Sequence, residues 1–275
     1  MVKFHPVLIY NFGDKLFQIF MSHLKFSIIT FALFLAQISY GQQDSIKAIS
    51  SFNGTIGITN NGFSIIPTFS LNNPAAIMNF TWRKNRFSFN PDIRLVPDLS
   101  RGGLIFWFKY RLVEKKKFSL RIGVHPAFSL IRRTISDAGV GTEITEMLRF
   151  IAGEIVPNYQ ITPNWSVGAV FLHGSGLQKH GPQNTNVLFL NTSIANIKVG
   201  GDFRLQLIPT VFFLNLDGRE GSYFSGTTII SKKNLPFTLQ STINQTFSSN
   251  IVGNKDFMWN VMLAYNFGNT IRSIK

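Results

Sequence analysis

Residues 86–95 read RFSFNPDIRL, and along this stretch every polar or charged residue is followed by an apolar one. Because successive side chains of a β-strand point to opposite faces, Asp92 and Arg94 share one face and the two phenylalanines share the other. Residues 103–112, GLIFWFKYRL, repeat the pattern, and the thirteen residues 118–130 keep a single register. This period of two predicts antiparallel strands with one apolar and one polar face.

Strands of about 9–11 residues with alternating faces are the unit of a transmembrane β-barrel, whose outer face meets lipid. The candidate strands are 63–71, 75–82, 86–95, 103–112, 118–131, 146–161, 165–173, 186–195, 201–215, 222–231, 236–247 and 257–267. Twelve is an even number, as bacterial barrels require. The strands at 146–161, 165–173 and 222–231 alternate poorly. In the first of them, Glu154 does not fit a polar face opposite Leu148 and Phe150 unless a bulge intervenes.

Composition supports lipid contact for the apolar face. The chain has 275 residues, 28 phenylalanines, no cysteine and a formal charge of +14. So many rings need a large core or a lipid environment. An eight-stranded lipocalin or a soluble β-sandwich would also alternate, but long apolar runs such as 104–112 fit lipid better. No segment has the uninterrupted apolar length of a transmembrane helix. The predicted fold class is therefore all-β, a single antiparallel transmembrane barrel.

An N-terminal signal peptide is predicted in front of the barrel. A basic start at Lys25 precedes an apolar run at 26–36, and the small residues Ser39 and Gly41 come before Gln42. This is the order of a cleavable export signal. The expected division of the chain is an over-extended start at 1–20, a signal peptide at 21–41, a periplasmic lead-in or short first strand at 42–61, the barrel at 62–267 and a tail at 268–275.

Connection lengths give an independent test, because outer-membrane barrels alternate short periplasmic turns with longer external loops. The short set is 83–85, 113–117, 162–164, 196–200 and 232–235. The longer set is 96–102, 132–145, 174–185, 216–221 and 248–255, with 72–74 as an exception. The alternation predicts that the short turns and both chain ends lie on the periplasmic side.

If the apolar face meets lipid, the lumen is basic. The residues predicted to line it are Arg86, Arg94, Lys109, Arg111, Arg121, His125, Arg149 and Arg204, with the acidic partners Asp92 and Glu154. Fixed cations near one mouth raise the local concentration of anions and favour anion passage. The alternative is that these side chains pair with the two carboxylates and with neutral side chains and plug the barrel.

The last candidate strand, 257–267, alternates Phe257, Trp259 and Phe267 with polar or small residues. It resembles the C-terminal strand of bacterial outer-membrane barrels, which ends in an aromatic residue recognised by the barrel-assembly machinery. The resemblance implies that Phe267 is the assembly signal, although residues 268–275 follow it. It also implies an outer-membrane location, with membrane lipid and the assembly machinery as partners.

An enzymatic alternative rests on His173-Gly174-Ser175. The motif resembles the His-x-Ser of lipid A 3-O-deacylases, which implies that His173 is the base and Ser175 the nucleophile. The family also uses a carboxylate to orient the histidine, and the nearest acid after Ser175 is Asp202, expected at the opposite end of the barrel.

The remaining patterns point to no cofactor. His125, His173 and His180 are too scattered to predict a metal site, and no basic helix or aromatic platform predicts nucleic-acid binding. The leading hypothesis is therefore a non-enzymatic, porin-like outer-membrane barrel for anionic or small polar solutes. A structural or adhesive barrel acting through the loops at 132–145 and 174–185 is a third hypothesis.

Overall fold

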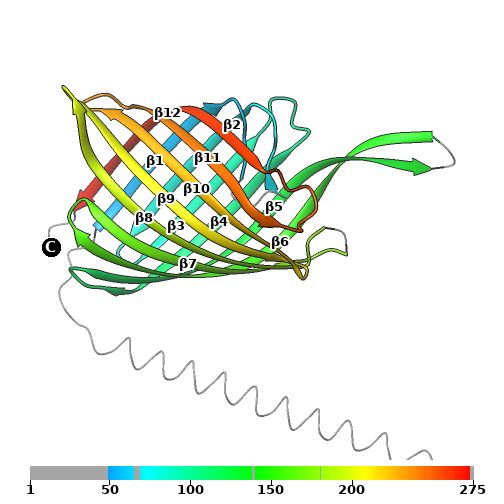
Figure 1. The fold of residues 1–275 in the computed structure, drawn as a ribbon, viewed down its shortest axis with the longest axis horizontal. Helices are drawn as coiled ribbons and strands as arrows, with labels where there is room; N and C mark the ends of the chain where they lie inside the picture. Colours follow the sequence, from blue (N-terminus) through cyan, green and yellow to red (C-terminus); the bar gives the residue numbers. More distant parts are fainter. Residues whose placement is uncertain (1–48, 65–68, 138–139, 180, 273–275) are drawn as a thin grey trace, which may run out of the picture. The chain divides into compact units, whose positions relative to one another are not determined.

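The computed structural model describes residues 49–64, 69–137, 140–179 and 181–272, which form one closed barrel of twelve antiparallel strands (Figure 1). The strands are β1 (Ile49–Thr59), β2 (Ala75–Lys84), β3 (Phe87–Leu95), β4 (Gly102–Glu114), β5 (Phe118–Asp137), β6 (Val140–Thr162), β7 (Trp165–Gly176), β8 (Asn184–Gly200), β9 (Phe203–Leu216), β10 (Arg219–Lys232), β11 (Phe237–Ser249) and β12 (Phe257–Arg272). Each strand pairs with its sequence neighbours, and β1 pairs with β12. The predicted all-β, twelve-stranded barrel is confirmed. The described residues contain no helix of the length and apolarity needed to cross a membrane.

The first strand differs from the prediction. The described parts of the predicted strand at 63–71 form no strand, and the first strand is β1, which was expected only as a lead-in or a short extra strand. The apolar residues Phe63 and Leu71 are nevertheless buried, at 5% and 4% exposure. These two residues are therefore apolar because they pack within the long β1–β2 connection. Since β1 ends at Thr59 and β2 begins at Ala75, the connection that includes 72–74 is long, like the other loops on its side.

The barrel closes along β1 and β12, whose register runs from Ile49 opposite Arg272 to Thr59 opposite Met262. Phe267 lies opposite Gly54, and a Cβ added to Gly54 would come within 2.3 Å of the Phe267 ring. The ring occupies the space that a side chain at Gly54 would need. The barrel thus extends beyond both predicted limits, 62 and 267, and the first part of the predicted tail at 268–275 belongs to β12.

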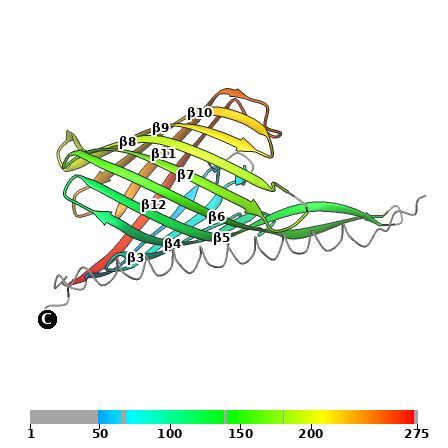
Figure 2. The ribbon, with the colours of Figure 1, turned by 90° about the horizontal axis from the view of Figure 1, so that it is seen from below.

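Strands β5 and β6 continue past the barrel as a paired ribbon, visible in green in Figures 1 and 2. The predicted loop at 132–145 is therefore mostly strand. The two strands stay in one unbroken register from Phe118 opposite Tyr159 to Asp137 opposite Val140, so the bulge considered for β6 is absent from this ladder. The turn expected at 196–200 also belongs to a strand, β8, and the chain reverses at Gly201 and Asp202.

Residues on the two faces of each strand differ sharply in exposure. Phe212 is 0% exposed and its neighbour Phe213 is 49% exposed, because the first points into the barrel and the second points outward. Phe108, Ile155 and Trp259 are likewise exposed on the outer surface. The outer face is therefore apolar around the barrel, as a lipid-facing surface requires.

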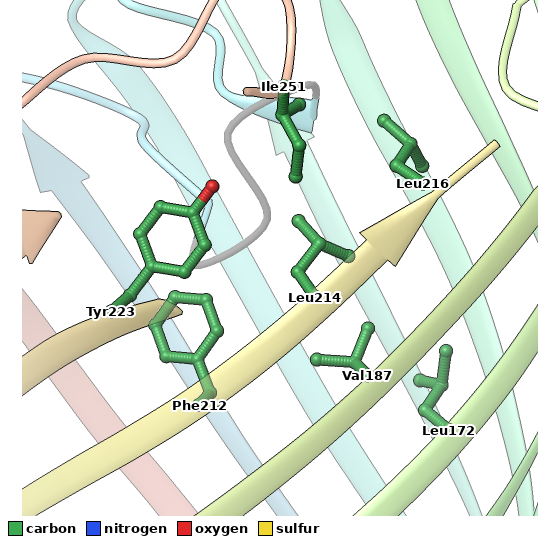
Figure 3. Close-up of a cluster of buried hydrophobic side chains, with 7 residues drawn as sticks. All are labelled: Leu172, Val187, Phe212, Leu214, Leu216, Tyr223 and Ile251. Carbon is green, nitrogen blue, oxygen red and sulfur yellow. The ribbon is translucent and has the colours of Figure 1, made fainter. Parts of the chain in front are cut away.

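Apolar side chains also fill part of the interior. Figure 3 shows Tyr223 beside Phe212, Leu214 between Phe212 and the β8 residue Val187, and Ile251 of the β11–β12 loop above them. The rings of Phe212 and Tyr223 stack with centroids 4.6 Å apart and an interplanar angle of 12°. This cluster fixes β7 to β10 against one another on the inside of the barrel.

Candidate lumen site

A cavity of about 580 Å³ lies inside the barrel. One wall, from β4 to β8, is largely apolar and carries Trp107, Phe150 and Phe189. The wall formed by β10 to β12, β1 and β2 is largely neutral and polar. Its polar lining residues are Thr55, Asn79, Thr227, Thr238, Gln240, Thr242, Asn260 and Asn266. The cavity is therefore amphipathic.

A group of charged and aromatic residues extends from the apolar wall toward the short-turn end. Glu154 Oε1 lies 3.5 Å from Lys109 Nζ and 3.8 Å from Arg121 Nε. Lys109 Nζ also lies 4.2 Å from the centre of the Trp107 ring, a cation–π geometry. His125 packs against the other side of this group, with its ring centroid 3.7 Å from that of Trp107. Two cations thus share one buried carboxylate, and the charged group has a formal charge of +1.

The alternating register explains how these residues meet. Lys109 lies opposite Gly123, and Gly123 lies opposite Glu154, so the three positions form one inward-facing row across β4, β5 and β6. Gly123 leaves the space between the two charged side chains open, since a Cβ there would lie 3.0 Å from Glu154 Oε1. Larger residues at Gly123 would compete with the Glu154 carboxylate for this space.

A second ion pair lies on the cavity wall. Arg94 donates through Nε and Nη2 to the two carboxylate oxygens of Asp92, at 2.9 and 2.7 Å. This two-bond geometry neutralises the guanidinium locally. The Arg94–Asp92 pair therefore adds hydrogen-bonding groups to the cavity and no net charge.

The other residues predicted to line the lumen lie nearer the ends of the strands. Arg111 pairs with Glu114, which also accepts from Arg83 at 3.3 Å. Arg86 lies in the β2–β3 turn, one residue before β3, where its carbonyl accepts from the Arg111 amide. Arg204 donates to the carbonyls of Gly201 and Phe203 in and beside the β8–β9 turn.

Arg149 is a correction, because it is not a lumen residue. In β6 the buried, inward residues are Leu148, Phe150 and Glu154, so Arg149 belongs to the exposed outer set. The prediction assumed that apolar residues face lipid everywhere. In this strand Leu148 and Phe150 point into the lumen instead. The apolar residues are therefore on the inner face, and Arg149 is on the outer one.

Charge is distributed unevenly along the barrel. Within the described ranges, the acidic residues of the short-turn half are Glu114, Glu154 and Asp202. The basic residues of that half are Arg83, Lys84, Arg86, Lys109, Arg111, Lys115, Lys116, Lys117, Arg121, Lys198, Arg204, Lys232, Lys233 and Arg272. The opposite half carries both signs in similar number. The short-turn mouth is therefore strongly positive.

Apolar residues pack together at the opposite, long-loop end of the barrel. Leu71 from the β1–β2 connection packs with Ala75 and Val96, and Ile251 from the β11–β12 loop packs on the Phe212 cluster. Phe69 makes an edge-to-face contact with Phe150 at 5.2 Å. A solute that enters from the long-loop side thus meets an apolar surface before it reaches the cavity.

His173 and Ser175 lie on the outer face of β7, outside the lumen. His173 Nδ1 is 2.8 Å from Asn186 Oδ1, so the group beside the histidine is an amide rather than a carboxylate. Asp202 lies in the β8–β9 turn at the other end of the barrel and does not reach it. No hydrogen bond joins His173 to Ser175 in the described part of the chain. The geometry lacks the acid that the deacylase resemblance requires.

Sequence reasoning did not find the aromatic lining of the cavity. Trp107 could have been recognised, because it shares the inward register with Lys109 in residues 103–112. Phe150 and Phe189 could not, since a phenylalanine in a strand was assigned to lipid by default. In the described ranges, no three histidine, cysteine or acidic residues are grouped as a metal site would need.

Comparison with known proteins finds a likeness to solved structures alone. No protein-family model matches the chain, and no curated protein matches its sequence. A KdgM porin in complex with disordered oligogalacturonate is similar in structure, with a TM-score of 0.46 at 10% identity over 79% of this chain and 99% of that one. The β domain of the Bordetella autotransporter BrkA has a TM-score of 0.42 at 8% identity over 80% and 98%. At these values no ligand or activity is transferred to this chain.

Proposed function

We propose that the protein is a porin-like outer-membrane channel for small polar or anionic solutes. The observation that carries the proposal is the positively charged group in the lumen, in which Lys109 and Arg121 share the single carboxylate of Glu154. Its formal charge of +1 and the basic short-turn mouth favour anions along the axis of the barrel. The other predicted lumen cations at that end, Arg86, Arg111 and Arg204, add to the positive potential.

Location and partners belong to the same proposal. The apolar outer face meets outer-membrane lipid, and the short turns with both described chain ends lie in the periplasm. The predicted signal peptide at 21–41 lies outside the described residues and would supply export. The barrel-assembly machinery is the proposed folding partner, and β12 with Phe267 is the segment that it would engage.

Planar-bilayer recording of the refolded full chain tests the channel. We expect conductance in KCl, and a reversal potential under a salt gradient that shows preference for chloride. Correctly folded protein without conductance would overturn the proposal. Conductance with a preference for potassium would overturn the claim of anion selectivity, although the protein would still be a channel.

The β5–β6 ribbon supports a second candidate, a barrel that binds a partner through its extracellular extension. Ion pairs brace the ribbon and its base, with Arg133 3.1 Å from Glu146 and Arg132 3.8 Å from Glu143. Protease treatment of intact cells should cleave within 133–144 if the ribbon is exposed. Loss of cell adhesion without loss of conductance after this cleavage would favour the adhesive role.

A further inference from the structure

We infer that the lumen cavity binds small planar aromatic solutes that carry their polar groups along one edge. This inference rests on the proposed channel function and names the class of solute that the channel would select. Its basis is the division of the cavity into an aromatic wall and a neutral polar wall. A volume of about 580 Å³ falls within the usual range of small-molecule sites, about 300–1,000 Å³.

The aromatic wall provides the surface for a flat ring. Trp107, Phe150 and Phe189 line it, and Phe63 and Phe69 lie on the side of the β1–β2 connection. Aromatic pairs in offset or edge-to-face geometry gain about 0.5–1.5 kcal/mol beyond the burial of area alone. A planar ring therefore gains more from this wall than an aliphatic solute of equal size.

Two residues of the polar wall provide unused hydrogen-bonding groups. Asn79 and Gln240 make no side-chain hydrogen bond to any described residue, although both line the cavity. Both side chains are partly exposed, so their amide groups are available to bond the polar substituents of a bound solute.

The other polar side chains of the wall formed by β10 to β12, β1 and β2 already bond to one another. Thr227 and Thr242 share a hydrogen bond of 3.1 Å, and Asn266 bonds to both Thr55 and Thr238. A sugar carries hydroxyls around its whole rim, and those directed at the rings of Trp107, Phe150 and Phe189 would be left unsatisfied. A solute with polar groups on one edge avoids this cost. The two walls therefore favour hydroxylated or carboxylated aromatic compounds over sugar acids.

Tryptophan fluorescence provides a direct test, because Trp107 is the tryptophan that lines the cavity. Trp82, Trp165 and Trp259 are all strongly exposed on the outer face. The probe is 4-nitrobenzoate, an aromatic acid that quenches tryptophan, added to the full chain refolded in lipid vesicles. We expect saturable quenching in the wild type and none in Trp107→Phe. Any quenching that remains in the variant comes from the outer tryptophans and measures the probe dissolved in the lipid. Galacturonate should not displace the probe, and 4-hydroxybenzoate should.

A pair of glycine variants separates the cavity from the outer surface. A Cβ at Gly103 meets no atom within 4 Å, and Gly103 lines the cavity, so Gly103→Leu fills the site without a backbone clash. Gly153→Leu places the same side chain on the outer face, where the added Cβ makes only an ordinary contact of 3.8 Å. We expect Gly103→Leu to weaken probe binding about tenfold or more, since it occupies the ligand's volume. Gly153→Leu should bind like the wild type.

The outcomes distinguish the two proposals. Unsaturable quenching, equal binding by both leucine variants, or displacement by galacturonate would overturn the aromatic site. If salt conductance is present in that case, the channel proposal stands. Saturable quenching without conductance would overturn the channel and retain the binding site.

Discussion

Substitution of Glu154 by glutamine should destabilise the barrel and increase its preference for anions. The side chain is 4% exposed, and its Oε1 lies 3.5 Å from Lys109 Nζ and 3.8 Å from Arg121 Nε. At an effective dielectric constant of about 20, each contact corresponds to about 4–5 kcal/mol of Coulomb energy. Arg121 is 37% exposed, so solvent screens the second contact. Removal of one partner from a buried pair typically costs about 3–5 kcal/mol, and we expect about 3 kcal/mol here.

The control is Glu114→Gln. Glu114 also contacts two basic residues, Arg83 and Arg111, but its side chain is 44% exposed at the short-turn end. Exposed pairs contribute about 0–1 kcal/mol, so this variant should unfold almost like the wild type. The measurement is urea unfolding in lipid vesicles, followed by tryptophan fluorescence, with reversal potentials recorded in parallel.

Two results would refute the reasoning. Equal losses of unfolding free energy in Glu154→Gln and Glu114→Gln would show that burial does not set the strength of the lumen pair. Glu154→Gln raises the formal charge of the group from +1 to +2. An unchanged reversal potential would therefore show that the charged group does not face the ion pathway. The double variant Lys109→Met with Glu154→Gln should recover part of the lost stability, since it removes one of the cations left without a carboxylate.

Further predictions use neighbouring residues as controls. Phe212→Ala should cost about 3–5 kcal/mol of unfolding free energy because it leaves a void in the interior cluster, whereas Phe213→Ala, on the outer face, should cost clearly less in the same urea titration. Ile251→Ser should raise single-channel conductance because it weakens the packing of the β11–β12 loop on the Phe212 cluster, and Val252→Ser, 69% exposed, should not; equal conductance in both would contradict this expectation. A chain that ends at Phe267 should be less stable after refolding in vesicles, because it loses the pairing of 268–272 with β1. An unchanged unfolding temperature, read from the loss of the folded band in gel electrophoresis of heated samples, would contradict this.

The sequence was sufficient for the architecture because lipid and strand geometry impose a regular pattern. In residues 86–95 and 103–112 every second side chain must suit lipid, so the register could be assigned from these stretches alone. The short turns were recognisable for the same reason. The number of strands was also correct, although the described residues of the predicted strand at 63–71 lie outside any strand and β1 is the first strand instead.

Errors arose where apolar residues serve the interior. Leu148 and Phe150 were placed opposite the polar face, and both are buried. Alternation shows that two faces differ, but it does not show which face is inside when the lumen is itself partly apolar. Arg149 was misplaced by this rule, and Trp107 was overlooked as a cavity residue. The β5–β6 ribbon was missed because Arg132 and Arg133 interrupt the apolar period of β5, and a strand outside the membrane needs no lipid-facing side.

The interior of this barrel combines two requirements that usually oppose each other. A channel that selects by charge alone needs a wide polar lumen, and a rigid barrel of twelve strands gains stability from apolar packing such as the Phe212 cluster. Here the two are separated along the axis, with apolar residues toward the long-loop end and cations toward the short-turn end. A solute moving inward would lose water against the aromatic wall before it meets Lys109 and Arg121. Selection by shape thus precedes selection by charge, which is why the cavity variant Gly103→Leu should change solute binding while Glu154→Gln changes ion preference.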